Sequence, residues 1–346
     1  MKLTDWIKGA TVAAACLLGA GGMAAAQEMK TVRIATSTTG MLYVPIYVAE
    51  SMGYFDEEGI DLELQTMKSS AIMAAVIGGD VDIYPGTPAA ALRAVSAGTD
   101  IRIFGTLVTQ YASNVVLSGS KAEELGIDEN SSFEERVAAL EGLTIGVTGA
   151  GSGTHQLALY LLREAGLNPD SDATIVFVGG SREILAAFER DRIDAFILSN
   201  PTSDTAVMDQ GGFLLFDMAG GAVEELQNYP YITLDARGTW LEEDPERSKA
   251  IVRALAKALA AIKDPEQADE VRETVYQDYL SQFDKELFEA AWSNVTQAYP
   301  ATPALTEEML GMAIEYLNAV SEDKYDKSLA ETALMTQFTD EALASQ

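Results

Sequence analysis

The residues Leu-Thr-Ile-Gly-Val-Thr-Gly-Ala-Gly-Ser-Gly-Thr, positions 143–154, predict a short buried strand that runs into a glycine-rich turn, and residues 155–164 continue as a helix. The first N–H groups of a helix have no partner within it, and the helix dipole adds partial positive charge at the same end. Because glycines let a ligand approach the main chain closely, this junction is suited to binding a small anion.

The chain repeats this arrangement nearer its amino terminus. Residues 31–37 predict a strand, Thr38-Thr39-Gly40 a polar loop, and residues 43–52 a helix. Two such units, each with a polar loop at the carboxyl end of its strand, predict one ligand held between two lobes.

The two halves of the chain share a further pattern. The sequence Ala-Ala-Val at residues 74–76 precedes Val81-Asp82-Ile83, and Ala-Ala-Phe at residues 186–188 precedes Ile193-Asp194-Ala195. The aspartates lie 194 − 82 = 112 residues apart, and a proline-containing turn follows each segment. We interpret this as a shared architecture of two lobes, with chance similarity of two α/β units as the alternative. We expect both aspartates to brace turns rather than to contact a ligand.

Residues 1–26 have the pattern of a cleaved secretory signal peptide. Lys2 and Lys8 form a charged region, residues 10–20 are apolar, and three alanines precede Gln27. The apolar stretch raises a membrane-anchor alternative, which its alanine and glycine content disfavours. Cys16 raises a lipoprotein alternative, which the short apolar run before it disfavours. We therefore expect an exported mature chain that has lost Cys16.

The mature chain would then contain no cysteine, which excludes disulfides, a thiolate nucleophile and cysteine-ligated metals. The formal net charge is −30, and without Lys2, Asp5 and Lys8 it becomes 21 − 52 = −31. We expect no nucleic-acid partner for so acidic a chain. An anionic ligand would need local donors that act against the overall field.

Short strands alternate with amphipathic helices through most of the chain, which predicts α/β layers with mainly parallel sheets. From residue 245 onward the pattern is helical and predicts a C-terminal helical cap. Residues 119–132 and 229–238 are predicted to cross between lobes. The first lobe would then combine residues 29–116 with residues 235–346, and residues 117–234 would form the second. The predicted strands are residues 32–37, 62–66, 83–84, 101–107, 115–117, 144–147, 174–178, 195–198 and 214–216.

One long run resembles a known family. The sequence Val-Pro-Ile-Tyr-Val-Ala-Glu-Ser-Met-Gly-Tyr-Phe-Asp-Glu-Glu-Gly-Ile-Asp-Leu at residues 44–62 is similar to the first helix and second strand of substrate-binding proteins of bacterial ABC importers. The similar branch serves nitrate, sulfonates, taurine and thiamine-pyrimidine precursors. Residues 140–147 and 185–194 resemble the family's entry into its second lobe and the segment before its site. The resemblance covers nearly all of residues 30–260.

This resemblance implies a two-lobed periplasmic binding protein of the type II-like class, with mainly parallel sheets flanked by helices and a C-terminal helical cap. Such a protein closes around one small-molecule ligand in the periplasm and delivers it to an ABC permease in the inner membrane. We expect a monomer.

The family's ligand lies between the lobes and is touched by loops at strand ends. Carried onto this sequence, the expected ligand-binding residues are Ser37, Thr38, Thr39, Gly40, Tyr43, Ser69, Ser70, Gly86, Thr87, Tyr111, Thr148, Gly151, Ser152, Gly153, Thr154, His155 and Asn200. Their hydroxyl and N–H groups suit the oxygens of an oxyanion.

Plain structural roles remain open for several of these residues. Ser69 and Ser70 would instead cap a helix beginning near Ala71. The tyrosines would instead belong to the core or the rim, and the residue 149–154 loop would be a tight turn without a ligand. Lys68 and Arg182 are possible anion partners, but solvated surface charge is the preferred interpretation.

The sequence lacks residues that the enzymatic alternatives need. His155 is the only histidine, and Ser152 lacks the glycines two positions to either side that a Gly-x-Ser-x-Gly elbow requires. The alternating glycines of this loop do not match the dinucleotide fingerprint, and no ATP-binding phosphate loop occurs. One relative on this scaffold makes the thiamine pyrimidine with a cysteine-rich iron site, which the mature chain would be unable to form. We expect no catalytic residue, cofactor or metal.

The sequence thus predicts a receptor for a small anion, with a sulfonate or carboxylate favoured. The alternatives are a pyrimidine-precursor binding protein and an enzyme acting on a pyrimidine-like substrate on the same scaffold. A sensory receptor that presents its closed state to a signalling partner is a third possibility.

Overall fold

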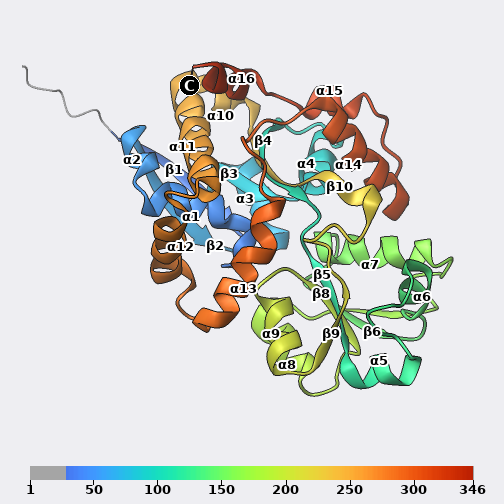
Figure 1. Ribbon diagram of the computed structural model, residues 1–346. Coiled ribbons are helices and arrows are strands. Elements are labelled where there is room, and N and C mark those ends of the chain that lie inside the picture. Colours follow the sequence, from blue (N-terminus) through green and yellow to red (C-terminus); the bar gives the residue numbers. More distant parts are fainter. Residues whose placement is uncertain (1–28, 346) are drawn as a thin grey trace, which may run out of the picture.

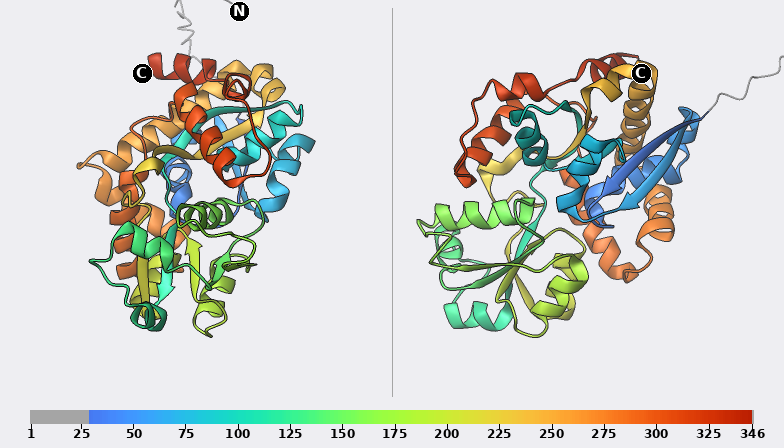
Figure 2. Two further views of the ribbon diagram at one scale, coloured as in Figure 1. Left: turned by 90° about the vertical axis from the view of Figure 1, so that its right-hand side faces the viewer. Right: turned by 180° about the vertical axis from the view of Figure 1, so that it is seen from behind.

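A computed structural model describes residues 29–345. The predicted signal peptide, residues 1–26 with Cys16, lies outside the described residues. The described chain forms two lobes, each built on a five-stranded sheet. Figures 1 and 2 agree that the segment coloured green to yellow-green forms one lobe, while the blue, orange and red segments form the other.

The sheet of lobe 1 has the strand order β2-β1-β3-β10-β4. Strand β1 pairs in parallel with β2 and β3, whereas β10 runs antiparallel to β3 and β4. These strands are β1 (Lys30–Thr36), β2 (Ile60–Thr66), β3 (Ile83–Gly86), β4 (Ile101–Gln110) and β10 (Gln227–Arg237).

The sheet of lobe 2 repeats this topology with the order β7-β6-β8-β5-β9. Strand β6 pairs in parallel with β7 and β8, and β5 is antiparallel to β8 and β9. These strands are β5 (Asn114–Ser118), β6 (Thr144–Val147), β7 (Thr174–Phe177), β8 (Ala195–Leu198) and β9 (Gly212–Phe216). Both sheets are therefore mixed but mainly parallel, as predicted, because four of the five strands run in one direction and one strand, β10 or β5, runs against its two neighbours.

The two predicted aspartates occupy equivalent places in the two sheets. The Asp82 carboxylate accepts the N–H of Arg33 on β1 at 2.9 Å, and the Asp194 carboxylate accepts the N–H of Thr144 on β6 at 2.8 Å. In return the N–H of each aspartate donates to the carbonyl of the same partner. Both residues thus brace the entry of a strand, and the shared pattern reflects a shared architecture.

Helices cover the sheet of lobe 1, and the C-terminal helices form the predicted cap. Helix α11 packs on both α1 and α16, and α4 packs on β4 and β10. The helices of lobe 1 are η1 (Met41–Tyr43), α1 (Val44–Ser51), α2 (Tyr54–Glu57), α3 (Ser69–Gly78), α4 (Pro88–Ser96), α10 (Gly238–Glu243), α11 (Pro245–Lys263), α12 (Ala268–Val275), η3 (Tyr276–Leu280), α13 (Lys285–Val295), η4 (Thr296–Ala298), α14 (Glu307–Val320), α15 (Leu329–Ala333) and α16 (Gln337–Ala344). None of the helices within residues 29–345 is long and apolar enough to cross a membrane.

The helices of lobe 2 flank its sheet in the same manner. Helix α7 packs on β6 and β8, and α9 packs on β5, β8 and β9. The lobe 2 helices are α5 (Gly119–Leu125), α6 (Phe133–Ala138), α7 (Gly153–Glu164), α8 (Ser181–Phe188) and α9 (Thr202–Asp209), and η2 (Glu224–Leu226) lies on the return to lobe 1.

Local sequence features explain where the helices and the turn within residues 44–62 begin and end. Pro45 lies in the first turn of α1, where a missing N–H leaves no hydrogen bond unmade. Gly53 has a φ of 72°, a left-handed conformation that ends α1 and lets α2 begin. Gly59 has the same φ of 72° and turns the chain into β2.

Strand pairing moves both predicted lobe boundaries. Residues 114–116 belong to β5 in the lobe 2 sheet, and residues 227–234 belong to β10 in the lobe 1 sheet. The predicted crossing at residues 119–132 instead contains α5 and the loop that follows it inside lobe 2. We therefore propose that lobe 2 spans residues 114–216 and that the crossings are residues 111–113 and 217–226.

Buried tyrosines surround these crossings. The Tyr111 ring lies 4.2 Å from that of Tyr231 and 5.4 Å from that of Tyr229, measured between centroids. Tyr316 of α14 packs on both Tyr111 and Tyr160, and Tyr160 belongs to α7 of lobe 2. The side of α14 therefore touches lobe 2 next to the crossings.

Candidate ligand-binding site

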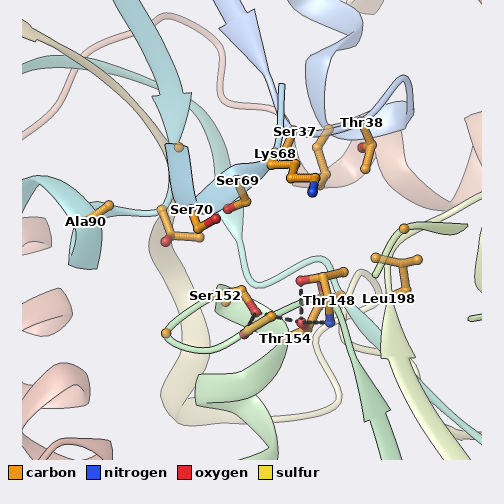
Figure 3. Close-up of a pocket in the computed structure, with 18 of the residues that line it drawn as sticks. Ser37, Thr38, Lys68, Ser69, Ser70, Ala90, Thr148, Ser152, Thr154 and Leu198 are labelled. Carbon is orange, nitrogen blue, oxygen red and sulfur yellow. Dashed lines mark hydrogen bonds between the residues drawn. The ribbon is translucent and has the colours of Figure 1, made fainter. Parts of the chain in front are cut away.

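A cavity of about 1130 Å³ lies between the lobes. It is slightly larger than the roughly 300–1000 Å³ typical of small-molecule sites. Figure 3 shows Ser37, Thr38, Lys68, Ser69 and Ser70 on one side, facing Thr148, Ser152, Thr154 and Leu198 on the other. The lobe 1 residues that line it include Ser37, Thr38, Leu42, Tyr43, Thr66, Met67, Lys68, Ser69, Ser70, Met73, Tyr84, Gly86, Thr87, Ala90, Arg93, Tyr231 and Ile232. Ser113 of the first crossing and the lobe 2 residues Thr148, Gly149, Ala150, Gly151, Ser152, Gly153, Thr154, Val178, Gly179, Gly180, Glu183, Leu198 and Ser199 complete the lining.

The glycine-rich turn forms the lobe 2 wall. Ser152 caps α7, because its Oγ accepts the N–H of His155 at 3.2 Å. The hydroxyls of Ser152 and Thr154 lie 2.9 Å apart, and those of Thr148 and Thr154 also lie 2.9 Å apart. The Thr148 N–H donates to Thr154 Oγ1 at 3.0 Å. These bonds fix the shape of the turn through contacts within lobe 2.

Several backbone donors of this turn have no partner within the described chain. The N–H groups of Gly153 and Thr154 belong to the first turn of α7, which has no acceptor for them within the helix. The N–H groups of Gly149 and Ala150 likewise make no hydrogen bond to residues 29–345. The lobe 2 wall therefore presents a group of backbone donors at the positive end of a helix.

The lobe 1 wall adds the start of α3. The helix begins at Ser69, so its N-cap residue is Lys68, and no side chain caps it. Ser69 and Ser70 therefore lie inside the first helical turn and do not fill the capping role that was the alternative for them. Both residues line the cavity wall, where the Ser69 side chain also hydrogen-bonds that of Tyr84.

Helix α4 reaches the cavity from the same lobe. Thr87 is its N-cap residue, and Ala90 and Arg93 follow at intervals of three on one face of the helix. Nη1 of Arg93 donates to the carbonyl oxygen of Gly151 at 3.4 Å. A side chain of lobe 1 thus contacts the glycine-rich turn of lobe 2.

The net charge of the residues that line the cavity is opposite in sign to the net charge of the whole chain. Lys68 and Arg93 are cationic, and Glu183 is the one carboxylate among the lining residues. The lining therefore carries 2 − 1 = +1, whereas the chain carries −30. The Lys68 ammonium group forms no ion pair or hydrogen bond with another residue in the 29–345 range, so it is available to an anion.

Most of the predicted ligand-binding residues come together at this cavity. Those that line it are Ser37, Thr38, Tyr43, Ser69, Ser70, Gly86, Thr87, Thr148, Gly151, Ser152, Gly153 and Thr154. Those that do not line it are Thr39, Gly40, Tyr111, His155 and Asn200.

Tyr111 and Asn200 act behind the cavity wall. Tyr111 is 1% exposed, and its hydroxyl donates to the carbonyl oxygen of Gly153 at 2.6 Å. Asn200 is also 1% exposed, and its side chain donates to the Asp204 carboxylate at 2.7 Å. Tyr111 thus supports a residue of the site from within the protein, whereas the partner of Asn200, Asp204, does not line the cavity.

Thr39, Gly40 and His155 lie beside the site. Thr39 is exposed, and the buried Gly40 donates its N–H to the Tyr47 hydroxyl at 3.4 Å. Nδ1 of His155 accepts the N–H of Gly151 at 3.0 Å. The predicted loops thus reach the cavity, and a subset of their residues lines it.

Sequence reasoning missed Arg93, Tyr84 and Tyr231 as lining residues. The spacing of Thr87, Ala90 and Arg93 was the signal that places Arg93 on the cavity face, given that Thr87 was expected there. Tyr84 and Tyr231 gave no such signal, because they lie in buried strands of mixed pairing whose register the sequence does not reveal. Tyr231 is fixed by a 2.5 Å hydrogen bond with the Ser113 hydroxyl.

Part of the lining is apolar. Leu42 and Met73 contribute from lobe 1, Val178 and Leu198 from lobe 2. The cavity therefore combines a polar, donor-rich region with surfaces suited to hydrocarbon. Among residues 29–345, no group of three or more His, Cys, Asp or Glu side chains is arranged to hold a metal ion.

A model of the NMT1-like family matches residues 25–276. The chain belongs to this family. The match spans most of the described chain and includes every residue that lines the cavity. The resemblance seen at residues 44–62 is thereby confirmed.

Among curated proteins, a similar chain is the bicarbonate transport ATP-binding protein CmpC of Synechocystis sp., with 27% identity over 247 residues. The match covers 68% of this chain but only 36% of the relative. This chain thus spans about a third of the length of that relative.

Solved structures confirm the fold. A protein from Bordetella bronchiseptica RB50 superposes with a TM-score of 0.78 at 24% identity, covering 92% of this chain and 98% of that one. The alkanesulfonate-binding protein SsuA from Xanthomonas axonopodis pv. citri, solved with MOPS, gives a TM-score of 0.69 at 16% identity, covering 89% and 99%. The two-lobed fold with a sheet in each lobe is that of periplasmic substrate-binding proteins of ABC importers.

Proposed function

We propose that this NMT1-like chain is an extracytoplasmic solute-binding protein that captures a small organic anion between its lobes and delivers it to an ABC permease in the inner membrane. A sulfonate or carboxylate is the favoured ligand. The proposal includes export through the predicted signal peptide and a monomeric receptor without catalytic activity.

One observation carries the proposal, namely that helix N-termini of both lobes converge on the cavity. Helices α3 and α4 begin at it from lobe 1, and α7 and α8 begin at it from lobe 2. Each presents partial positive charge and unpaired N–H groups at the same space. An anion that contacts both lobes would favour the closed form.

The composition of the lining supports an organic rather than an inorganic anion. Lys68 and Arg93 can neutralise one negative charge, and the backbone donors can bind its oxygens. The volume of about 1130 Å³ and the apolar side chains leave space for a hydrocarbon body that an inorganic oxyanion lacks. The name of the alkanesulfonate-binding relative is compatible with this ligand class, whereas the bicarbonate in the name of CmpC is an inorganic anion.

A thermal-shift panel on the mature chain tests the proposal. We expect alkanesulfonates or carboxylates to raise the melting temperature, because a ligand that binds only the folded state stabilises it by RT ln(1 + [L]/Kd). Alkylamines and alcohols of matched length are the controls, and pyrimidines test the alternative ligand. Stabilisation by pyrimidines alone, or conversion of any compound to product, would contradict an anion receptor.

A further inference from the structure

The turn that forms the lobe 2 wall depends on a single imidazole. His155 is the only histidine of the chain and the third residue of α7. Its Nδ1 accepts the N–H of Gly151 at 3.0 Å. Gly151 lines the cavity, whereas His155 does not. The ring therefore stands behind a residue of the site and holds it by its backbone.

Gly151 is held on its carbonyl side as well. Its carbonyl oxygen accepts Nε2 of Gln156 at 2.9 Å and Nη1 of Arg93 at 3.4 Å. Its φ of 73° is left-handed, a conformation that glycine adopts without steric cost. With His155 on one side and Gln156 on the other, the Gly151 peptide groups have a fixed orientation.

The bond from Gly151 requires a neutral ring. An imidazole nitrogen accepts only when it carries no proton, so the proton of His155 must reside on Nε2. A cationic ring would turn a second N–H toward the Gly151 N–H and break the bond. The start of α7 also disfavours a cation.

Burial and one nearby cation oppose protonation of the ring. Arg93 of α4 is the nearby cation, and β7 presents the edge-packed ring of Phe177 at 5.2 Å and no titratable side chain. Glu183 of α8 is a carboxylate that lines the same cavity. Burial, and after it the Arg93 charge, lowers the pKa of the His155 imidazole.

We propose that His155 is a positioning residue for anion binding: its neutral imidazole holds the Gly151 peptide and thereby orients the donors of residues 149–154 without touching the ligand. The inference rests on the proposed function, because it assigns a role within the same site. It makes anion affinity fall on acidification, because protonation of His155 releases the turn.

The direction of the pH effect separates this role from direct contact. A histidine that touches the anion would bind it more tightly when protonated, so affinity would rise at low pH. A positioning histidine gives the opposite slope. Because its pKa is lowered in the folded state, its contribution is complete above the ordinary histidine range near pH ~6.5 and is lost as pH falls through the folded-state value.

Calorimetric titration with 1-butanesulfonate between pH 8 and pH 5 measures this slope, because a sulfonate stays ionised throughout. We expect wild-type affinity to fall about threefold to tenfold over this range, the value of one hydrogen bond. His155→Asn places an oxygen near the position of Nδ1, so we expect affinity close to wild type at pH 8 and a flatter pH profile. His155→Gln places its oxygen farther out and should weaken binding like His155→Ala.

The ligand-free protein provides a test that does not depend on the ligand class. We expect nitrogen NMR of the single histidine to show the Nε2–H tautomer, and the Gly151 amide signal to shift with the same titration. An Nδ1–H tautomer, or a Gly151 amide signal that does not shift with the titration, would overturn the role of His155. If 1-butanesulfonate fails to bind at any pH, the sulfonate proposal fails, and the NMR result still decides the role of His155.

Discussion

Arg93 is the cation of lobe 1 that reaches the turn of lobe 2. It lies on the cavity face of α4, and its guanidinium donates to the Gly151 carbonyl oxygen at 3.4 Å. A guanidinium in this place can serve both an incoming anion and the closed arrangement of the lobes.

Arg93→Ala should weaken binding of 1-butanesulfonate by about tenfold or more, since hydrogen bonds to charged groups contribute about 1.5–3 kcal/mol. Arg182→Ala is the matched control, because Arg182 is an exposed cation beside Glu183 that does not line the cavity. Titration calorimetry of both variants gives the answer. Equal effects of the two substitutions would show that affinity depends on the net charge of the protein and not on the position of Arg93.

Asp235 is a buried carboxyl beneath the lobe 1 wall. It is 0% exposed, its Oδ1 lies 2.7 Å from Thr233 Oγ1, and its Oδ2 has no partner in the described chain. Burial raises the pKa of the Asp235 carboxyl well above its usual range. The folded state therefore holds this proton to higher pH than the unfolded chain does.

The stability due to protonated Asp235 is present below the unfolded-state pKa and is lost as pH rises through the folded-state value. Asp235→Asn removes this titration. We expect the variant to be more stable, relative to wild type, at pH 8 than at pH 4, so the difference in free energy of unfolding (variant minus wild type) should be larger at pH 8. Urea denaturation at the two pH values measures the difference, and a difference that does not change with pH would contradict the assignment.

At the scale of single elements, a serine at the start of a helix can either contact a ligand or cap the helix, and α3 and α6 allow the two roles to be compared. Ser69 and Ser70 occupy its first turn without capping it, and both line the cavity. Ser132 of α6 shows the other role, because its Oγ accepts the Glu135 N–H in a complete capping box.

Replacing both Ser69 and Ser70 with alanine should lower the affinity for 1-butanesulfonate about threefold to tenfold per hydroxyl that contacts the anion, the range for a neutral hydrogen bond. The melting temperature should change little, because alanine favours a helix interior. Ser132→Ala should do the reverse, with a stability loss of about 1 kcal/mol and unchanged affinity. A stability loss in the Ser69 and Ser70 variant with normal binding would restore the capping role.

The sequence predicts these elements well where the pattern is local. Residues 144–147 and 195–198 form strands with the predicted limits, and the helical pattern predicted from residue 245 onward begins with α11 at Pro245. Strand β10 was missed because residues 229–238 alternate poorly and pair with β3 and β4, which lie more than a hundred residues earlier. The side-chain directions of Tyr111 and Asn200 depend on those long-range contacts, so the loops were predictable and these contacts were not.

At the scale of the whole molecule, Gly153 is a point of close approach between the two lobes. A Cβ added there would lie 2.9 Å from the Tyr231 hydroxyl and 3.0 Å from Thr87 Cγ2, both on lobe 1. The absence of a side chain at this position lets the turn of lobe 2 approach the opposite wall.

Gly153→Ala should therefore hinder lobe closure and weaken 1-butanesulfonate binding about tenfold, in line with overpacking costs of about 1–3 kcal/mol. Gly149→Ala is the control within the same turn, because its added Cβ meets no atom within 4 Å. Small-angle scattering with and without 1-butanesulfonate should show compaction in the control and less in Gly153→Ala. Equal compaction in both would mean that closure does not depend on this approach.

The most direct measurement is a crystal structure of the mature chain grown with 1-butanesulfonate. We expect the sulfonate between the lobes, with oxygens in hydrogen-bond distance of backbone N–H groups at the start of α7 and of Ser69 or Ser70 on α3. We expect the alkyl chain against Met73, Leu42 or Leu198. A sulfonate bound outside the interlobe cavity, or bound through one lobe alone, would contradict a cleft that holds an anion between helix N-termini of both lobes.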